Sequence, residues 1–433
     1  VTNTLFRLVL VFNYCIIGCN KTYNDILETS LMNRLWVILL FVPLITVLQS
    51  CADFGSEDKE EIKNIVESDS VSISIGQIIT VEHNINQTII ITDSLAHIDY
   101  GLKYPVTYEF EIPQDSENLN VYGKYNASQD WFLIDKKTSN DFFNGIEAVR
   151  FNYDENIAYV SVGFSILSDT IYIKIDNNIN ENIHISFKRI SKYYDNREAA
   201  VTITADDWAD YSNEKFIQAC QNFRSYNLWY SVAIITRWID NQSTWNDIQG
   251  QLDDGLIEVV SHSRTHPNVP YADLEGEVLG SKQDIINNLN LINLNRSGSK
   301  EYVYAWVAPY GEYSEAIDTM TSNAKYLVSR LFYYNNIYFS DWDSNLNKFN
   351  PVNASIEVGN SSYWGSTDIN ELNAAFDNAI DSKGIYHLIT HPNILEWDKD
   401  FTSSHLEYIS NRKDIWYVGF GHLYLYHYIS NSK

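Results

Sequence analysis

Two short motifs place carboxylates and imidazoles where they could share a metal ion. Ala199–Trp208 reads AAVTITADDW and contains the adjacent acids Asp206 and Asp207. Neighbouring carboxylates repel each other unless a cation separates their roles, so metal ligands are expected elsewhere in the chain. Residues 258–267 read EVVSHSRTHP and place His262 and His266 four residues apart. On one turn of helix-like backbone, both imidazoles could face the same ion.

This set of residues is suited to metal-assisted hydrolysis. One carboxylate and two imidazoles bind a divalent ion such as zinc and leave positions for water and a substrate oxygen. The ion activates water near neutral pH and polarises a carbonyl. The spare acid, Asp206 or Asp207, could take the proton of the water. His391, in the segment HLITHP, is suited to protonate a leaving group.

Strands and helices must bring these residues together. The apolar, β-branched run before Asp206 predicts a buried strand. From residue 197 onward, strand-like and helix-like segments alternate, which predicts a parallel sheet long enough to close into a barrel. Further strands are expected at 228–235, 256–260, 302–307, 385–389 and 415–420, and helices at 213–224, 245–252, 274–291, 314–323 and 369–379. The candidate residues then lie at the carboxyl ends of strands.

Residues 70–192 have a different pattern. Short apolar or alternating runs are separated by clusters of Asn, Asp and Gly. This pattern predicts an all-β sandwich, immunoglobulin-like by strand spacing alone. We expect this domain to act as a spacer, with a carbohydrate-binding face as the alternative.

The N-terminal region predicts a signal peptide. Residues 35–48 form an apolar run that follows Met32 and Arg34 and ends in LQSC at Cys51, and this run is too short to span a bilayer comfortably. The LQSC ending resembles a bacterial lipobox. The resemblance implies that Cys51 carries the lipid, that Met32 is the true start and that residues 1–31 lie upstream. A transmembrane hairpin is the alternative. Residues 52–69 are expected to form an acidic, solvated tether, similar to the signals that send Gram-negative lipoproteins to the cell surface.

Charge and cysteine content narrow the function further. The chain has 30 Lys and Arg against 56 Asp and Glu, a net charge of -26. This charge argues against nucleic acid or an anionic membrane surface as the partner. After processing only Cys220 would remain free, so no disulfide framework is expected, and Cys220 is expected to be a small buried residue.

The motifs together resemble a known family. TADDW, SHSRTHP, VAPYG and HLITHP, in this order, resemble the successive motifs of the polysaccharide deacetylase domain, the NodB-homology domain of carbohydrate esterase family 4. The resemblance covers residues 197–433, and the closing IWYVGFGHLYLYHYI resembles the last strand and helix of that domain. It implies a distorted (β/α) barrel that removes acetyl groups from N-acetylated or O-acetylated polysaccharide.

The resemblance also implies roles for single residues. Asp206 would be the catalytic base and His391 the general acid, and the backbone N–H of Tyr310 would stabilise the oxyanion. The implied ligands of the divalent ion, zinc with cobalt or nickel as alternatives, are Asp207, His262 and His266. The residues expected to contact the substrate are Trp208, Pro309, Tyr310 and Trp342.

The chain departs from the family pattern in two places. Trp208 replaces the usual glycine after the acidic pair, and its bulk is expected to narrow the groove. Val307 stands where the motif usually has the arginine that orients the base, so this arginine is expected to be missing. Deacetylases of poly-β-1,6-N-acetylglucosamine resemble this variant. Asp341 and Trp342 resemble the motif that supports the acid histidine, with a surface turn as the alternative reading.

We therefore predict a metal-dependent carbohydrate deacetylase anchored by Cys51 in the envelope of a Gram-negative bacterium, as a surface-exposed outer-membrane lipoprotein. Its partners would be an acetylated polysaccharide and, through the lipid, a membrane. The alternatives are a catalytically silent glycan-binding lipoprotein, an esterase of the acetyl-xylan type and a purely structural surface protein.

Overall fold

The computed structural model describes most of the chain after residue 69. The described residues are 70–74, 82–84, 88–92, 105–114, 118–136, 148–163, 170–176, 184–291, 303–331, 348–349, 355–360, 365–395 and 399–431. Ser70–Lys433 form one compact unit. The predicted signal peptide, the acidic tether, Cys51 and Trp342 lie outside the described residues. Within the described part, no helix is both long and apolar enough to cross a membrane.

The described residues between 70 and 190 form two five-stranded sheets. One has the order β1-β3-β9-β5-β6 and the other β2-β10-β4-β8-β7. Buried side chains of both sheets, such as Phe110 and Ile173, share one apolar core. The immunoglobulin-like topology stays a prediction. The strands are β1 (Ser70–Ser74), β2 (Glu82–Asn84), β3 (Thr88–Thr92), β4 (Val106–Glu111), β5 (Asn120–Lys124), β6 (Phe132–Leu133), β7 (Ala148–Asn152), β8 (Ile157–Val162), β9 (Thr170–Asp176) and β10 (His184–Ile190).

Strands and helices alternate in the rest of the chain, as predicted. All strand pairs here are parallel, in the order β16-β15-β14-β13-β12-β11-β18-β17, with β19 also paired to β11. This open half-barrel fits the expected distorted (β/α) barrel. The elements are β11 (Ala199–Trp208), α3 (Asn213–Ser225), β12 (Tyr230–Ile234), α4 (Gln242–Asp253), β13 (Ile257–Ser261), α5 (Ser281–Asn288), β14 (Ala305–Val307), α6 (Glu315–Asn323), β15 (Val328–Arg330), β16 (Lys348–Phe349), β17 (Ser355–Glu357), α7 (Ile369–Asp381), β18 (Ile385–Thr390), α8 (Asp400–Ile409), β19 (Ile415–Tyr417) and α9 (Phe420–Asn431).

Strand β11 lies at the centre of this sheet. It pairs with β18 on one side and with β12 and β19 on the other. Its apolar residues are buried, as expected for a strand covered on both faces. The register with β12 shifts between Ala205 and Trp208. Such a bulge redirects side chains locally, and here it contains Asp206 and Asp207.

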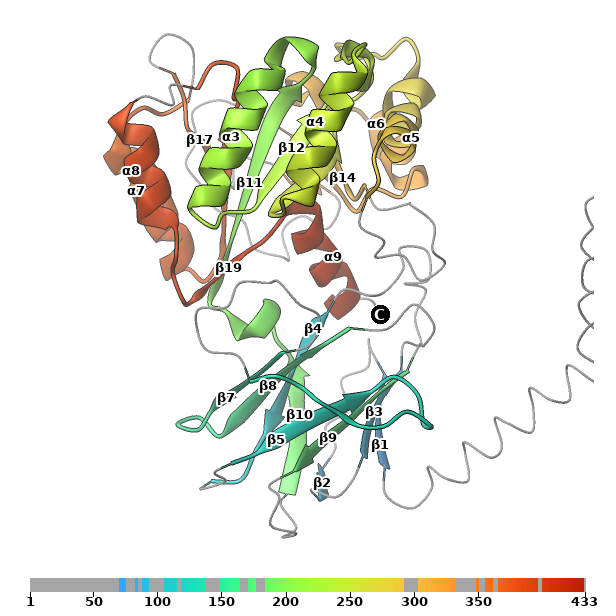
Figure 1. Cartoon of the computed structure of the whole chain (residues 1–433), viewed down its shortest axis with the longest axis vertical. Coiled ribbons are helices and arrows are strands. Elements are labelled where there is room, and N and C mark those ends of the chain that lie inside the picture. Colours follow the sequence, from blue (N-terminus) through green and yellow to red (C-terminus); the bar gives the residue numbers. More distant parts are fainter. Residues whose placement is uncertain are drawn as a thin grey trace, which may run out of the picture. The chain divides into compact units, whose positions relative to one another are not determined.

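Helices cover the sheet, and Figure 1 shows α3 and α4 across β11 and β12, with α5 and α6 on one side and α7 and α8 on the other. The helix predicted at 274–291 is not a uniform α-helix, because Gly276–Gly280 forms a π-helical segment before α5. The prediction of a strand at 415–420 was too long, since α9 begins at Phe420. The sequence pattern does not predict β15, β16, β17 or α8.

Candidate active site and metal centre

Three side chains from two strand ends converge on one point. Asp207 lies near the end of β11, and His262 and His266 follow β13. Their ligand atoms all lie within 4.8 Å of one another. Asp207 Oδ1 is 3.3 Å from His262 Nε2 and 3.5 Å from His266 Nε2. The structure thus brings together the three residues that the sequence proposes as metal ligands.

These distances fit a bound divalent ion. Two ligand atoms that bind one zinc ion at roughly 2.0–2.2 Å with tetrahedral geometry lie roughly 3.3–3.6 Å apart. The two measured carboxylate–imidazole separations, 3.3 and 3.5 Å, fall within this range. One carboxylate and two imidazoles are also a donor set that zinc, cobalt and nickel accept.

The surroundings prepare both imidazoles for metal binding. His262 is buried, and its Nδ1 lies 2.8 Å from the carbonyl oxygen of Val307. A carbonyl only accepts, so Nδ1 carries a proton, and this hydrogen bond orients the ring with Nε2 facing Asp207. Burial, with help from nearby His262, lowers the pKa of His266 to about 4. His266 is therefore neutral near pH 7, and the Nε2 atoms of both rings lie close to the Asp207 carboxylate.

The acidic partner is also held in its binding form. Burial alone would raise the pKa of Asp207, but the hydrogen bond and charge of His262 outweigh this effect and lower it. The carboxylate is therefore ionised across the neutral range.

The histidine loop is not a helical turn, and this part of the prediction was wrong. Ser263 and His266 have φ angles of 68° and 55°, in the left-handed region. Asp207, with φ of 78°, and Tyr310, with φ of 55°, share this property. Such angles are uncommon outside glycine and cost free energy, so they persist only where the surrounding structure enforces them. Four of them surround this site.

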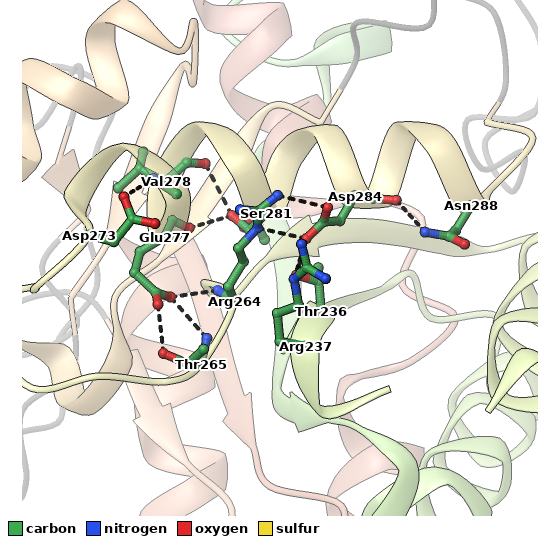
Figure 2. Close-up of polar contacts among 12 residues, drawn as sticks. Thr236, Arg237, Arg264, Thr265, Asp273, Glu277, Val278, Ser281, Asp284 and Asn288 are labelled. Atoms are coloured by element: carbon green, nitrogen blue, oxygen red, sulfur yellow. Dashed lines mark hydrogen bonds and ion pairs between the residues drawn. The ribbon is translucent and has the colours of Figure 1, made fainter. Parts of the chain in front are cut away.

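The helix that follows the loop holds it at two points (Figure 2). The Glu277 carboxylate accepts hydrogen bonds from the backbone N–H groups of Arg264 and Thr265, at 2.8 and 2.9 Å, and from Thr265 Oγ1 at 2.6 Å. Asp284 accepts two bonds from the Arg264 guanidinium, at 2.8 and 2.9 Å. Glu277 lies in the π-helical segment. These acids fix the backbone between the two histidines, and no motif in the sequence indicates them.

The predicted base, Asp206, is held by an arginine from another strand. Arg330, at the end of β15, is fully buried, and its guanidinium donates to Asp206 Oδ2 and, at 2.7 Å, to Thr204 Oγ1. Burial alone would raise the pKa of Asp206. The charge of Arg330, with smaller contributions from His262 and His391, instead holds this pKa well below its usual range. The arginine of the motif is absent, as expected, but a different arginine contacts this acid. The motif position is Val307, and Arg330 of the adjacent strand occupies the role instead.

The predicted acid, His391, has a carboxylate partner that the sequence did not reveal. Its Nδ1 lies 2.7 Å from Glu357 Oε1, at the end of β17, and its Nε2 lies 3.8 Å from Asp206 Oδ2. Burial alone would lower the pKa of His391, but the charge and hydrogen bond of Glu357, with the charge of Asp206, raise it to about 9. The ring is therefore protonated at neutral pH, as a general acid requires.

The segment after β14 contributes Tyr310. Pro309 starts a short 3-10 turn and is buried, so its predicted contact with substrate has no support in this structure. Tyr310 is 56% exposed, and its ring lies edge-on to His266 with centroids 4.4 Å apart. Ala308 N–H donates to the Arg330 carbonyl at 3.0 Å and ties this turn to β15. Tyr310 is thus beside the candidate metal centre.

Trp208 does not contact the candidate groove. It is fully buried, its ring stacks on Phe216 with centroids 4.8 Å apart, and its Nε1 donates to Asn213. The predictions that Trp208 narrows the groove and binds substrate were therefore wrong. The bulge in β11 turns this side chain into the core between the sheet and α3.

Comparison with known families gives the chemical context of this geometry. Residues 193–329 match the family model described as polysaccharide deacetylase. These residues are therefore similar to a polysaccharide deacetylase domain. The match includes Asp206, Asp207, His262, His266 and Tyr310 and ends one residue before Arg330. No curated protein matches the chain.

Three solved structures are distantly similar to the chain. A family 4 carbohydrate esterase from Streptomyces lividans, in complex with acetate, has 15% identity and a TM-score of 0.30, covering 49% of this chain and 86% of its own. A family 4 pseudoenzyme from Bacillus anthracis has 14% identity and a TM-score of 0.29, covering 51% of this chain and 62% of its own. A deacetylase domain from Bordetella bronchiseptica has 15% identity and a TM-score of 0.25, covering 34% of this chain and 69% of its own.

Proposed function

We propose that this chain is a metal-dependent hydrolase that removes acetyl groups from N-acetylated polysaccharide. The observation that supports this proposal most strongly is the convergence of Asp207, His262 and His266, with Asp206 and His391 beside them. The three ligands would hold a divalent ion, with zinc favoured. When bound, this ion supplies a Lewis acid that activates water and polarises the acetyl carbonyl.

Asp206 is suited to take the proton of the attacking water. Arg330 occupies its Oδ2, whereas Oδ1 is buried and has no hydrogen-bond partner among the described residues. The lowered pKa keeps this carboxylate ionised. Oδ1 is therefore the atom that accepts the proton, and Arg330 keeps it aimed.

His391 is suited to complete the reaction. Its Nδ1–H is held by Glu357, so Nε2–H is the proton that it can donate. Water adds to the acetyl carbonyl, the C–N bond breaks, His391 protonates the departing amine, and acetate leaves. Backbone N–H donation from Tyr310 would stabilise the oxyanion, and one preorganised donor of this kind is worth about 3 kcal/mol.

The chain's place in the cell is a further part of the proposal. The LQSC sequence that ends at Cys51 supports lipidation of this cysteine and attachment to the outer membrane of a Gram-negative bacterium. Mass spectrometry of the protein expressed in such a host tests this, since a lipid-modified peptide that begins at Cys51 is expected. An unmodified peptide that spans residues 45–55 would exclude the anchor.

Acetate release is the direct test of the proposed activity. Purified protein is incubated with N-acetylated and O-acetylated glycans, with and without a chelator. We expect release from N-acetylated glycan that stops with chelator and returns with zinc or cobalt, and that is lost in Asp206→Asn. His405→Gln is the matched control, because this buried histidine bonds Tyr386 and Asn373 away from the site.

Other results would favour the alternatives. Release only from O-acetylated glycan would indicate an esterase. Glycan binding that survives Asp206→Asn, with no release by the wild type, would indicate a silent binding protein. Release that is indifferent to chelator would contradict the metal-dependent mechanism.

A further inference from the structure

Exposed aromatic rings gather beside the candidate metal centre. Tyr211 is 59% exposed, Trp238 is 42% exposed and Tyr310 is 56% exposed. Each follows a different strand of the sheet, β11, β12 and β14 respectively. Large apolar rings are costly to expose in a cluster, and such clusters mark binding surfaces.

The rings form a row that starts at a proposed metal ligand. The Trp238 centroid lies 5.9 Å from that of His266 and 6.0 Å from that of Tyr211. Tyr310 lies on His266 as well, with centroids 4.4 Å apart. The row Tyr211–Trp238 therefore leads away from the reacting centre, while Tyr310 lies next to it.

The loops that carry Tyr211 and Trp238 are fixed to each other. The Asp210 carboxylate accepts hydrogen bonds from the N–H groups of Asp240 and Asn241, at 2.9 and 3.2 Å, and from Thr244 Oγ1 at 2.7 Å. Asp210 precedes Tyr211, and Asp240 lies two residues after Trp238. The two exposed rings are thus presented by loops that share one anchor.

The Trp238 loop is also fixed to the histidine loop. Thr236 N–H donates to the Ser263 carbonyl at 3.2 Å, and Arg237 N–H donates to the Arg264 carbonyl at 2.9 Å. Thr236 Oγ1 adds a bond of 2.9 Å to Asp284. Because these hydrogen bonds within the protein hold the loop backbone, little backbone entropy is lost when Trp238 binds a ligand.

We propose that Tyr211 and Trp238 form a subsite for the pyranose ring next to the one that is deacetylated. A pyranose ring has apolar C–H faces and a hydroxylated rim, and Trp and Tyr match this pattern with an apolar ring and one polar group. The subsite begins at the metal ligand His266, so its occupant must be continuous with the reacting sugar. This inference rests on the proposed function, and it specifies an oligomeric or polymeric glycan as the substrate.

Binding of defined oligomers tests the subsite without catalysis. Metal-free protein is titrated by calorimetry with N-acetylglucosamine and with its β-1,6-linked and β-1,4-linked pentamers. We expect the wild type to prefer a pentamer to the monosaccharide. Trp238→Ala should lower the ratio of pentamer to monosaccharide affinity about tenfold, the loss typical of removing an aromatic ring that packs on its ligand. Tyr211→Ala should lower this ratio less. Trp238→Phe should restore most of it.

Matched measurements separate a subsite from a structural role. Tyr153→Ala removes an exposed aromatic ring of the β-sheet region and should bind the pentamer as the wild type does. Zinc stoichiometry and unfolding temperature of Trp238→Ala show whether the loop has stayed folded. With acetate release as readout, the variant should raise KM for the pentamer more than it lowers kcat.

The outcomes distinguish this inference from the proposed function. Pentamer binding that depends on Trp238 without any acetate release would uphold the subsite and contradict the activity. Acetate release by a wild type whose pentamer binding is unaffected by both alanine variants would uphold the activity and overturn the subsite.

Discussion

Replacing Glu357 with glutamine should move the alkaline limit of activity. His391 must be protonated to act as the acid, and Glu357 is the main group that raises its pKa to about 9. The difference from an ordinary value near 6.5 corresponds to about 3 kcal/mol in favour of the charged ring, at about 1.4 kcal/mol per unit. Glutamine keeps a hydrogen-bond acceptor but removes the charge, while burial still favours the neutral ring.

The expected size of the effect follows from these values. With the charge removed, we expect the pKa of His391 to fall by about 2 units, within the range of about 1–3 units for the loss of one close opposite charge. At pH 8 the protonated fraction would then fall about tenfold, whereas at pH 6 it would change little. The alkaline limit of activity should move to lower pH, because a His391 with a lower pKa loses its proton at lower pH. A bound dication shifts the pKa of His391 in the same direction in the wild type and in the variant. The difference between the two proteins therefore reports the effect of Glu357.

The assay is the pH profile of kcat/KM for acetate release between pH 5.5 and 9.5. Glu109→Gln is the matched control, because Glu109 is a fully buried carboxylate that bonds Arg189 and Ser191 away from the site. Its profile should keep the alkaline limit of the wild type. If the Glu357→Gln profile overlays the wild type up to pH 9, the assigned partnership of Glu357 and His391 is wrong.

Two further substitutions test the residues that hold the site. Arg330→Gln should lower the free energy of unfolding by about 3 kcal/mol, because it leaves the buried Asp206 charge unpaired. Urea denaturation measures this change, and Arg330→Lys should recover part of the lost stability. An unchanged free energy of unfolding in Arg330→Gln would argue against the ion pair of Arg330 and Asp206. Glu277→Ala should weaken zinc binding by about 10–100-fold, because three hydrogen bonds to the histidine loop are lost. Competition with a chromophoric chelator measures the zinc affinity, and Glu277→Gln should lose less of it than Glu277→Ala. A zinc affinity of Glu277→Ala within twofold of the wild type would show that Glu277 does not support the histidine loop.

The local pattern predicted the central part of the site. The apolar run before Asp206 and the one before His262 are the features of buried parallel strands, and parallel strands place their carboxyl ends at one edge. The sequence alone therefore predicts that Asp206 and His262 lie at the same edge of the sheet. The strand that precedes His391 was predicted on the same basis.

The partners of the base and the acid were not accessible in this way. Arg330 and Glu357 end strands of only three residues, β15 and β17, which are too short to show a periodic pattern. Their contacts with Asp206 and His391 depend on the order of the strands in the sheet. Glu357 reaches His391 because β17 pairs with β18, the strand that precedes His391. A motif search finds an arginine only at its usual position, and here Arg330 comes from the next strand.

The place of Trp208 depended on a register shift. In a regular strand, residues two apart share a face, so Trp208 would lie on the same face as Asp206. The shift between Ala205 and Trp208 breaks this alternation and turns Trp208 into the core. Bulges leave no reliable trace in composition, and the π-helical segment that carries Glu277 was missed for a similar reason.

Metal content tests the central claim most directly. Elemental analysis of purified protein, dialysed after loading with zinc, should find one zinc ion per chain in the wild type and in His405→Gln. It should find less than a tenth of this in His262→Ala and Asp207→Ala, provided that both variants are shown to be folded. A wild type that retains no divalent ion, or a folded His262→Ala that retains a full equivalent, would contradict the account.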